Sequence, residues 1–161
     1  MISSTLRKII MLQLFPVIDL EEGFREKPYL CSEGYPTYGY GKKIGKKGES
    51  LDKYAHMSIT KAEAFNLFSD FANNIIDSLS TKDWFVKQDV DRQVILISMC
   101  YQMGVYKVSK FKKMIDGLSV GDYEKAEREA LDSRWARQTP KRAHRHAKVL
   151  RTGNLAEFYK I

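Results

Sequence analysis

A glutamate, a cysteine and a threonine stand close together near the start of this chain, and their side chains could share one reaction. Eight residues separate Glu22 from Cys31, and five more separate Cys31 from Thr37. Hydrolysis of a glycosidic bond needs a proton donor for the leaving oxygen and, usually, a second group that activates water or attacks the sugar from its other face. Glu22 suits the first role, whereas Cys31 stands where a second carboxylate would be expected.

We expect Glu22 to lie at the end of a short helix that begins at Pro16, because proline is tolerated in a first turn and Gly23 supplies a stop. The negative end of the helix dipole disfavours an ionised carboxylate there, which suits a general acid. The simpler alternative is that Glu21 and Glu22 are merely two solvated acids at a helix end.

A hairpin must follow this helix if it is to bring the three side chains together. Between Phe24 and about Tyr54, the glycines, the prolines and the alternating "TYGYG" predict a small antiparallel sheet, with "KKIGKKGES" as its solvated turn. The next segment, "SITKAEAFNLFSDFANNIIDSL", opens with a capping box of Thr60 and Glu63. It predicts a helix of roughly 30 Å that bridges two lobes. Its apolar stripe consists of Phe65, Phe68, Ala72, Ile75, Ile76 and Leu79.

The rest of the chain is predicted to be helical. "DVDRQVILISMCYQMG" is apolar nearly all round and ends at Gly104, which is typical of a buried helix. Further helices are expected in "SKFKKMIDGL", in "GDYEKAEREALDS" and in "TPKRAHRHAKVLRTG", where Thr139 would be the cap, Pro140 the first residue and Gly153 the stop. The pattern is an α+β fold of one domain, residues 1–161. It has a sheet lobe (about 16–58), a bridging helix (about 60–80) and a larger helical lobe (about 81–161) that the N-terminal helix joins.

The charge of the chain predicts an anionic partner. Its 161 residues include 27 Lys and Arg against 20 Asp and Glu, a formal charge of +7. Nucleic acid, an acidic membrane and a polyanionic cell wall would each be attracted, and charge alone does not separate them. Metal catalysis is disfavoured because His144 and His146, two positions apart on a helix, point about 200° away from each other. "GYGKKIGKKG" lacks the residues that close a phosphate-binding loop.

The two cysteines and the N-terminal segment bear on the compartment. Cys31 lies in a polar hairpin and Cys100 in an apolar run, so we expect free thiols made in a reducing cytoplasm rather than a disulfide. The apolar stretch "IIMLQLFPVI" is too short to span a bilayer, and no small-residue cleavage site follows it. We expect it to form a helix that packs on the body; export or membrane tethering is the alternative.

The spacing within "DLEEGFREKPYLCSEGYPTYGYG" resembles that of the lysozymes of T-even bacteriophages. That family has a helix-borne Glu, an Asp eight residues later (Cys in some members) and a Thr after five more. "ITKAEAFNLF", "YQMG", "SRWARQTPKRA" and "RTG" also resemble the family, in the same order, so the resemblance covers the chain from about Leu14 to its end. It implies a two-lobed muramidase fold with a cleft, which cuts the β-1,4 bond between N-acetylmuramic acid and N-acetylglucosamine.

The resemblance implies a role for each matching residue. Glu22 would be the general acid, Thr37 would hold the attacking water and Cys31 would take the position of base or nucleophile. Arg142 would lie close to Glu22 and anchor it. Its charge would favour the ionised carboxylate, whereas the negative end of the helix dipole disfavours it. The implied substrate-binding or cleft-lining residues are Tyr101, Gln102, Phe111, Met114, Glu129 and Arg142.

Cys31 is where the chain departs from the family's commoner Asp. An unperturbed thiol is mostly protonated at neutral pH and is therefore a poor base. Cys31 could act as a thiolate at reduced rate, Glu33 could take part of the electrostatic role, or Glu22 with a water held by Thr37 could suffice. We prefer the first. Lys42 and Lys43 also depart from the family, which has His and an apolar residue there, so an ion pair of that His has no counterpart here.

The sequence as a whole favours a peptidoglycan muramidase that needs no metal or cofactor. We expect a monomeric phage endolysin, made in the host cytoplasm, which reaches the wall after membrane permeabilisation and causes lysis. Its partners would be peptidoglycan and anionic envelope polymers, with no specific nucleic acid and no stable membrane insertion. The alternatives are a weak or inactive wall-binding protein and a lytic transglycosylase that uses Glu22 alone. A nucleic-acid binder would explain the charge but not the hairpin.

Overall fold

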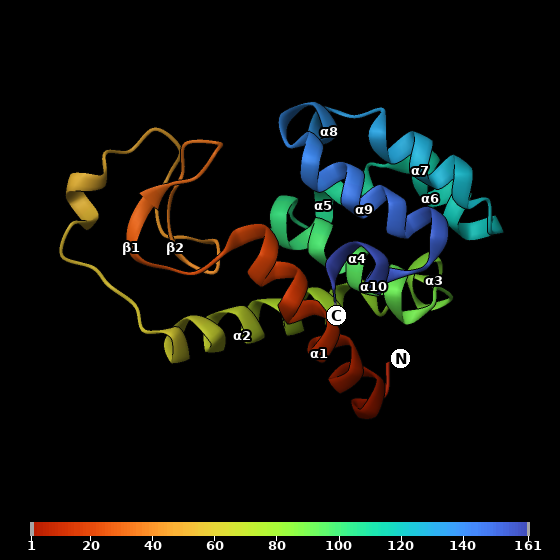
Figure 1. The fold of residues 1–161 in the computed structure, drawn as a ribbon, viewed down its shortest axis with the longest axis horizontal. Helices are drawn as coiled ribbons and strands as arrows, with labels where there is room; N and C mark the ends of the chain where they lie inside the picture. The colour runs from red at the N-terminus through yellow and green to blue at the C-terminus, as the bar shows by residue number, and fades with distance from the viewer. Residues whose placement is uncertain (1, 161) are drawn as a thin grey trace. The chain divides into compact units, whose positions relative to one another are not determined.

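The structure is a computed structural model that describes residues 2–160, and the predicted α+β class is confirmed (Figure 1). The chain divides into two compact units. Residues Ile18–Phe71 form what we call the sheet unit, and the residues before Ile18 together with those from Ala72 onward form the helical unit. Both boundaries fall inside helices, within α1 (Ser4–Glu22) and α2 (Lys61–Leu79).

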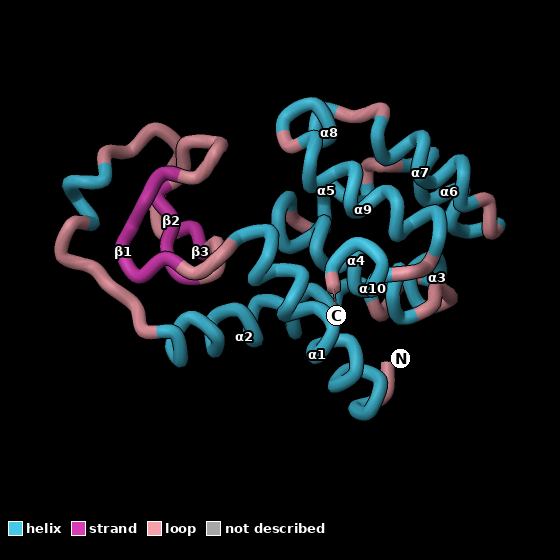
Figure 2. The backbone as a smooth tube through the Cα atoms, in the orientation of Figure 1, coloured by secondary structure: helices cyan, strands magenta, loops and turns pink. Residues whose placement is uncertain are grey.

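The sheet unit contains three antiparallel strands in the order β1-β2-β3, drawn in magenta in Figure 2. The strands are β1 (Arg25–Leu30), β2 (Pro36–Gly39) and β3 (Lys42–Lys43). A turn with Gly41 at φ +77° joins β2 to β3. The prediction that "KKIGKKGES" is only a turn is therefore wrong at its first two residues, which pair with β2. A short 3-10 helix, η1 (Leu51–Tyr54), follows the sheet.

Helix α1 runs through Pro16 without a break, so the predicted start at Pro16 is wrong. The missing proline N–H leaves the carbonyl of Leu12 without its helical partner. Leu12 is exposed, so water can reach that carbonyl. A proline inside a helix costs about 3 kcal/mol, whereas each fully buried aliphatic side chain contributes roughly 1.5–3 kcal/mol. Four such side chains lie along α1, namely Ile10, Leu14, Val17 and Ile18.

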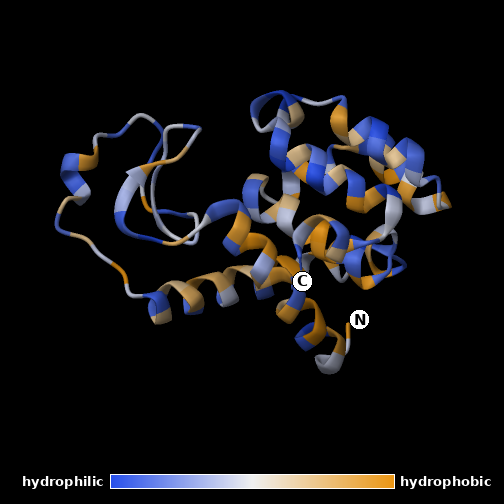
Figure 3. Ribbon diagram, in the orientation of Figure 1, coloured by the Kyte–Doolittle hydropathy of each residue, from blue (hydrophilic) through white to orange (hydrophobic). Residues whose placement is uncertain are grey.

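The helical unit is built around α4 (Val90–Met103). This helix packs against α3 (Asp83–Val86), α5 (Val105–Ser109) and α9 (Pro140–Thr152). The prediction of a buried helix that ends at Gly104 is confirmed, because α4 is buried from Arg92 to Tyr101 and Gly104 has φ +91°. Figure 3 shows the contrast with α9, which carries hydrophilic colour along much of its surface.

The N-terminal half of α1 is tied to the helical unit by Arg7, which confirms that the segment is a helix packing on the body. Its guanidinium donates to the side-chain and backbone oxygens of Asn73 (3.1 and 3.3 Å) and to Asp77 (2.6 Å). No helix of residues 2–160 is long and apolar enough to cross a bilayer.

The helix caps follow the predictions in part. The capping box of α2 is confirmed, because the Thr60 N–H donates to Glu63 and the Glu63 N–H donates to the Thr60 hydroxyl, both at 3.1 Å. Thr139 stands before Pro140 as predicted, but its side chain does not cap α9. The remaining helices are α6 (Lys112–Val120), α7 (Tyr123–Leu131), α8 (Arg134–Gln138) and α10 (Leu155–Tyr159). Of these four, the sequence predicted α6 and α7 but not the short α8 and α10.

Candidate active site

Glu22 is the last residue of α1, and the turn between β2 and β3 packs against its carboxylate. The helix ends because Gly23 adopts φ +68° and donates its N–H to the Asp19 carbonyl at 2.9 Å. A Cβ placed on Gly41 would lie 2.6 Å from Oε2 of Glu22. The φ of +77° favours glycine at this position, and any larger residue would also have to displace the Glu22 carboxylate from the turn between β2 and β3.

Cys31 begins the loop that joins β1 to β2. Its N–H donates to the Tyr35 carbonyl at 3.0 Å, and its carbonyl accepts from the N–H of Gly34 at 2.9 Å. These two bonds hold the backbone on both sides of the thiol. The side chain is half-buried, and both cysteines are free, as predicted.

Thr37 lies on β2 and is almost completely buried, with 1% of its surface exposed. Its hydroxyl donates to the Tyr35 carbonyl at 2.7 Å. Because the hydroxyl hydrogen is used in this bond, the Oγ1 lone pairs can accept a hydrogen bond from a further group. Glu22, Cys31 and Thr37 therefore all lie in the sheet unit, and their chemical roles stay predictions.

Glu33 is held on the same hairpin by β3. Its carboxylate lies 3.9 Å from Nζ of Lys43, and the same ammonium lies over the ring of Tyr35, 4.2 Å from the ring centre. Both members of the ion pair are partly exposed, so the pair itself contributes little to stability. Lys43 thus contacts both Glu33 and Tyr35 of the loop that carries Cys31.

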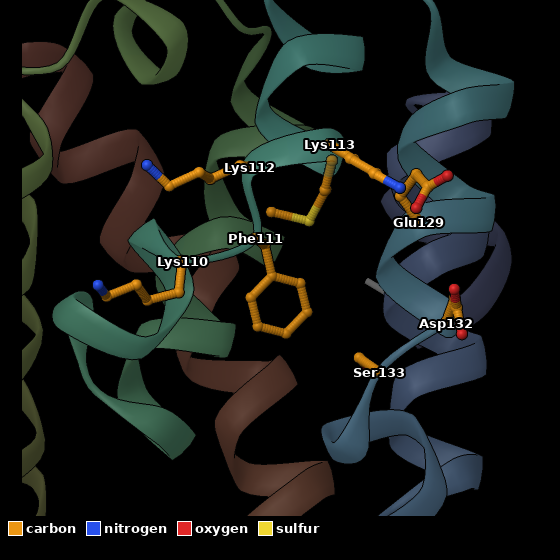
Figure 4. Close-up of a pocket in the computed structure, with 8 residues that line it drawn as sticks. Lys110, Phe111, Lys112, Lys113, Glu129, Asp132 and Ser133 are labelled. Atoms are coloured by element: carbon orange, nitrogen blue, oxygen red, sulfur yellow. The ribbon is translucent and has the colours of Figure 1, made fainter.

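Three of the predicted substrate-binding residues, Phe111, Met114 and Glu129, come together in one pocket of the helical unit (Figure 4). The pocket holds about 450 Å³, and the ring of Phe111 points toward the segment of Asp132 and Ser133. The same ring meets Trp135 edge-on, with 6.2 Å between the ring centres. The other residues of the pocket lining are Lys110, Lys112, Lys113, Asp132 and Ser133.

Gln102 is fixed by two side chains of the helical unit. Its Oε1 accepts from the indole N–H of Trp135 at 2.7 Å, and its Nε2 donates to the Thr139 hydroxyl at 3.2 Å. That hydroxyl in turn donates to the Trp135 carbonyl at 3.2 Å, so its hydrogen bonds join Gln102 to Trp135 rather than to the first turn of α9. Tyr101, one residue earlier, is buried. One Gln102 N–H is left for a ligand.

Arg142 is buried on α9, with 7% of its surface exposed. Its Nη2 donates to the backbone carbonyl and to the hydroxyl of Ser98, both at 3.2 Å. The same hydroxyl lies 2.7 Å from Nε2 of His146, whose Nδ1 lies 2.6 Å from the Tyr159 hydroxyl. Burial, and then the charges of Arg142 and Arg145, lower the pKa of His146 well below its usual value. The imidazole is therefore neutral at neutral pH.

Sequence reasoning missed the contact of Gly41 with Glu22 and the place of three lysines in the pocket lining. The "GYG" motif that contains Gly41 was noted as part of the hairpin, but its contact with Glu22 depends on how the hairpin returns toward α1. Lys110, Lys112 and Lys113 gave no signal beyond positive charge. Among the described residues, no group of three His, Cys, Asp or Glu side chains is placed to hold a metal ion.

Comparison with known proteins identifies the family of the chain. The family model described as phage lysozyme matches residues 19–151. The chain is 38% identical to the pre-baseplate central spike protein Gp5 of Enterobacteria phage T4, over 86% of this chain but only 27% of the spike protein. It is 30% identical to the probable T4-type lysozyme 2 of Dictyostelium discoideum, over 88% of this chain and 95% of that protein. The match to the phage lysozyme model, over more than three quarters of the sequence, shows that the chain belongs to the phage lysozyme family of glycoside hydrolases that act on peptidoglycan.

Proposed function

We propose that this chain hydrolyses the β-1,4 bond between N-acetylmuramic acid and N-acetylglucosamine, with Glu22 as the general acid. The observation that supports this proposal most strongly is the contact of the Glu22 carboxylate with the Gly41 backbone. Because Gly41 has no Cβ, the Glu22 carboxylate can pack directly against this turn, whereas a merely solvated acid needs no such close packing. Thr37 and the Cys31 loop belong to the same sheet unit.

In the proposed reaction, protonated Glu22 gives its proton to the glycosidic oxygen as the bond to the sugar breaks. A water that donates a hydrogen bond to Thr37 Oγ1 attacks the sugar, and the Cys31 thiolate takes the proton that this water loses. The thiolate could instead attack the sugar itself and form a covalent intermediate that water then hydrolyses. In both routes Glu22 and Cys31 must end the cycle in the protonation states in which they began.

Fragment analysis of purified peptidoglycan tests the proposal. We would digest it with the wild-type protein, with Glu22→Gln and with the matched control Glu21→Gln, which removes the neighbouring carboxylate of the same helix. The proposal predicts reducing-end muramic acid from the wild type and from Glu21→Gln, and a loss of about 100-fold or more in rate for Glu22→Gln.

The other outcomes identify the alternatives. Anhydromuramic ends would make the protein a lytic transglycosylase that uses Glu22 alone. Wall binding without any fragments would make it a non-catalytic binding protein. Equal rates for Glu22→Gln and Glu21→Gln would remove Glu22 from the role of general acid.

We also propose that the pocket of Phe111, Met114 and Glu129 binds part of the peptidoglycan substrate. It combines an aromatic ring and an apolar side chain, which can contact the face of a sugar, with charged and hydroxyl groups that can hydrogen-bond its polar substituents. Gln102, which is not part of this lining, would bind the substrate through its remaining N–H. If the pocket binds substrate, Phe111→Ala raises KM for peptidoglycan more than it lowers kcat.

The biological setting follows from the activity and the charge. We propose that the chain is a monomeric endolysin that accumulates in the host cytoplasm and lyses the cell after the membrane is permeabilised. The 38% identity to a phage spike protein favours a second candidate, a wall-cutting component of the virus particle. Mass spectrometry of purified particles separates the two, because only the second predicts the chain in stoichiometric amounts.

A further inference from the structure

Tyr29 faces the same side of the sheet as the residues to which we assign the chemistry. It lies on β1 directly opposite Thr37 of β2. Side chains of such antiparallel partners lie about 5 Å apart on one face of a sheet. Cys31 comes two residues after Tyr29 and still pairs with the opposite strand through its N–H, so it points to that face as well.

Arg25 holds the Tyr29 ring from one side. The centre of its guanidinium lies 4.4 Å from the ring centre, a cation–π contact. The two residues are four positions apart on β1, and the strand pairing shifts register between them. The register shift lies between the Arg25–Gly39 pair and the Tyr29–Thr37 pair, and the Arg25 guanidinium still stacks on the Tyr29 ring.

The phenol group lies within the electrostatic reach of both proposed reacting groups. Burial raises the pKa of Tyr29, the charge of Glu22 raises it further, Arg25 lowers it and Cys31 raises it. The phenol accordingly stays protonated at neutral pH and can both donate and accept a hydrogen bond. The Tyr29 hydroxyl interacts electrostatically with both Glu22 and Cys31, and Tyr29 shares a face of the sheet with Thr37. It is therefore suited to orienting the Glu22 and Cys31 side chains.

We propose that Tyr29 is a positioning residue of the reaction, whose hydroxyl orients the Glu22 carboxyl and the Cys31 thiol while Arg25 fixes the ring. This inference rests on the proposed roles of Glu22 and Cys31. It predicts that the hydroxyl, rather than the bulk of the ring, is what the reaction needs.

Tyr29→Phe tests this directly because it keeps the ring and the contact with Arg25. We expect kcat on peptidoglycan to fall about tenfold, the effect of one lost hydrogen bond to a charged group, with KM changed less than about twofold. The matched control is Tyr38→Phe. Tyr38 follows Thr37 on β2, so it faces the other side of the sheet, and its variant should keep the wild-type kcat. Arg25→Gln should reduce kcat, and Arg25→Lys should restore most of it.

A second readout does not depend on lysozyme activity. The rate at which iodoacetamide alkylates Cys31 at one fixed pH should change at least about threefold in Tyr29→Phe and stay unchanged in Tyr38→Phe. If the wild type releases no fragments, the proposed function fails, and the alkylation rate still decides whether Tyr29 orients the thiol. Wild-type kcat together with a wild-type alkylation rate in Tyr29→Phe would overturn the inference, as would equal losses in both variants.

Discussion

Single residues set the geometry of the sheet unit, and Gly41 shows this most clearly. Gly41→Ala would place a Cβ 2.6 Å from Oε2 of Glu22 and would strain a backbone at φ +77°. We expect at least a tenfold drop in kcat, because a proton donor that is displaced loses its alignment. Steady-state rates on purified peptidoglycan measure the effect.

Gly48→Ala is the control for the strain alone. Gly48 has φ +88°, and nothing lies within 4 Å of the Cβ that it would gain. This variant should lose about 1–2 kcal/mol of stability, the cost of a left-handed conformation for an L-residue, and keep its kcat. If the two variants had the same kcat, the contact of Gly41 with Glu22 would have no catalytic consequence.

Cys31 is the second residue whose identity should control the rate. We predict that Cys31→Ser loses most of the activity, by about 10–100-fold, because a hydroxyl is a much weaker base and nucleophile than a thiolate. Cys31→Asp should keep the activity, because it supplies the carboxylate expected at that position. Initial rates of fragment release test both variants.

The other thiol provides the control for Cys31. Burial raises the pKa of Cys100 to about 12, so it stays a neutral thiol packed in the apolar interior. Cys100→Ala should leave the rate per folded molecule unchanged. Cys31→Ser with wild-type rate would leave Glu22 and a Thr37-held water as the sufficient machinery.

At the scale of elements, the capping box fixes where α2 begins. The Thr60 hydroxyl accepts from the N–H of Glu63, and the reciprocal bond to the Thr60 N–H lowers the pKa of Glu63. Thr60→Ala should destabilise the fold by about 1 kcal/mol, as measured by urea unfolding. Ser58→Ala, an exposed hydroxyl two residues before the cap, should change stability by less than about 0.5 kcal/mol. An equal effect of the two variants would mean that the cap does not stabilise α2.

A buried polar chain joins three helices of the helical unit and makes their packing depend on pH. Ser98 of α4, His146 of α9 and Tyr159 of α10 form it. Because the pKa of His146 is lowered in the folded state, the unfolded chain binds one more proton below its ordinary value of about 6.5. The stability that neutral His146 provides is therefore present above that pH and is lost as the pH falls.

Urea unfolding at pH 7.5 and pH 5.0 measures this effect. The pH change should remove about 2 kcal/mol through His146 in the wild type. His146→Phe should be less stable than the wild type at pH 7.5. Acidification to pH 5.0 should lower its free energy of unfolding by about 2 kcal/mol less than it lowers that of the wild type. His144→Gln, which removes an exposed imidazole on the same helix, should keep the wild-type pH dependence. A His146→Phe curve parallel to that of the wild type would contradict the prediction.

At the scale of the whole molecule, the positive charge is unevenly divided. The sheet unit holds eight Lys and Arg against nine Asp and Glu, whereas the remaining residues hold nineteen against eleven. The excess that would attract an anionic wall therefore belongs to the helical unit, and the unit with Glu22 is close to neutral. We expect lysis rates to fall as ionic strength rises, because salt screens this attraction.

Four exposed cations outside the pocket test the attraction. Combined replacement of Lys107, Arg134, Arg137 and Lys141 by Gln should lower the rate several-fold at low salt and flatten its salt dependence. The charge-conserving control exchanges the same lysines for arginine and the same arginines for lysine, and should behave as the wild type. Lysis of whole cells that does not depend on salt in the wild type would contradict wall attraction by charge.

The sequence alone determined the features that depend on local chemistry. Three local signals each predict a structure within a few residues, and each prediction is confirmed: Gly23 after an acidic helix end, the Thr60–Glu63 capping box, and the largely apolar run before Gly104. The spacing of Glu22, Cys31 and Thr37, together with later motifs such as "YQMG" and "SRWARQTPKRA", was enough to indicate the family. These signals are strong because hydrogen bonds and φ values near a helix end involve neighbours in the chain.

Only the tertiary structure decided the features that depend on distant partners. Pro16 is tolerated inside α1 because the surrounding aliphatic side chains are buried, and the Thr139 hydroxyl bonds to Gln102 and Trp135 instead of capping α9. The contact of Gly41 with Glu22 and the stacking of Arg25 on Tyr29 arise from the path of the hairpin. Packing contacts of this kind outweigh local preferences of about 1–3 kcal/mol, so the residue pattern alone could not supply them.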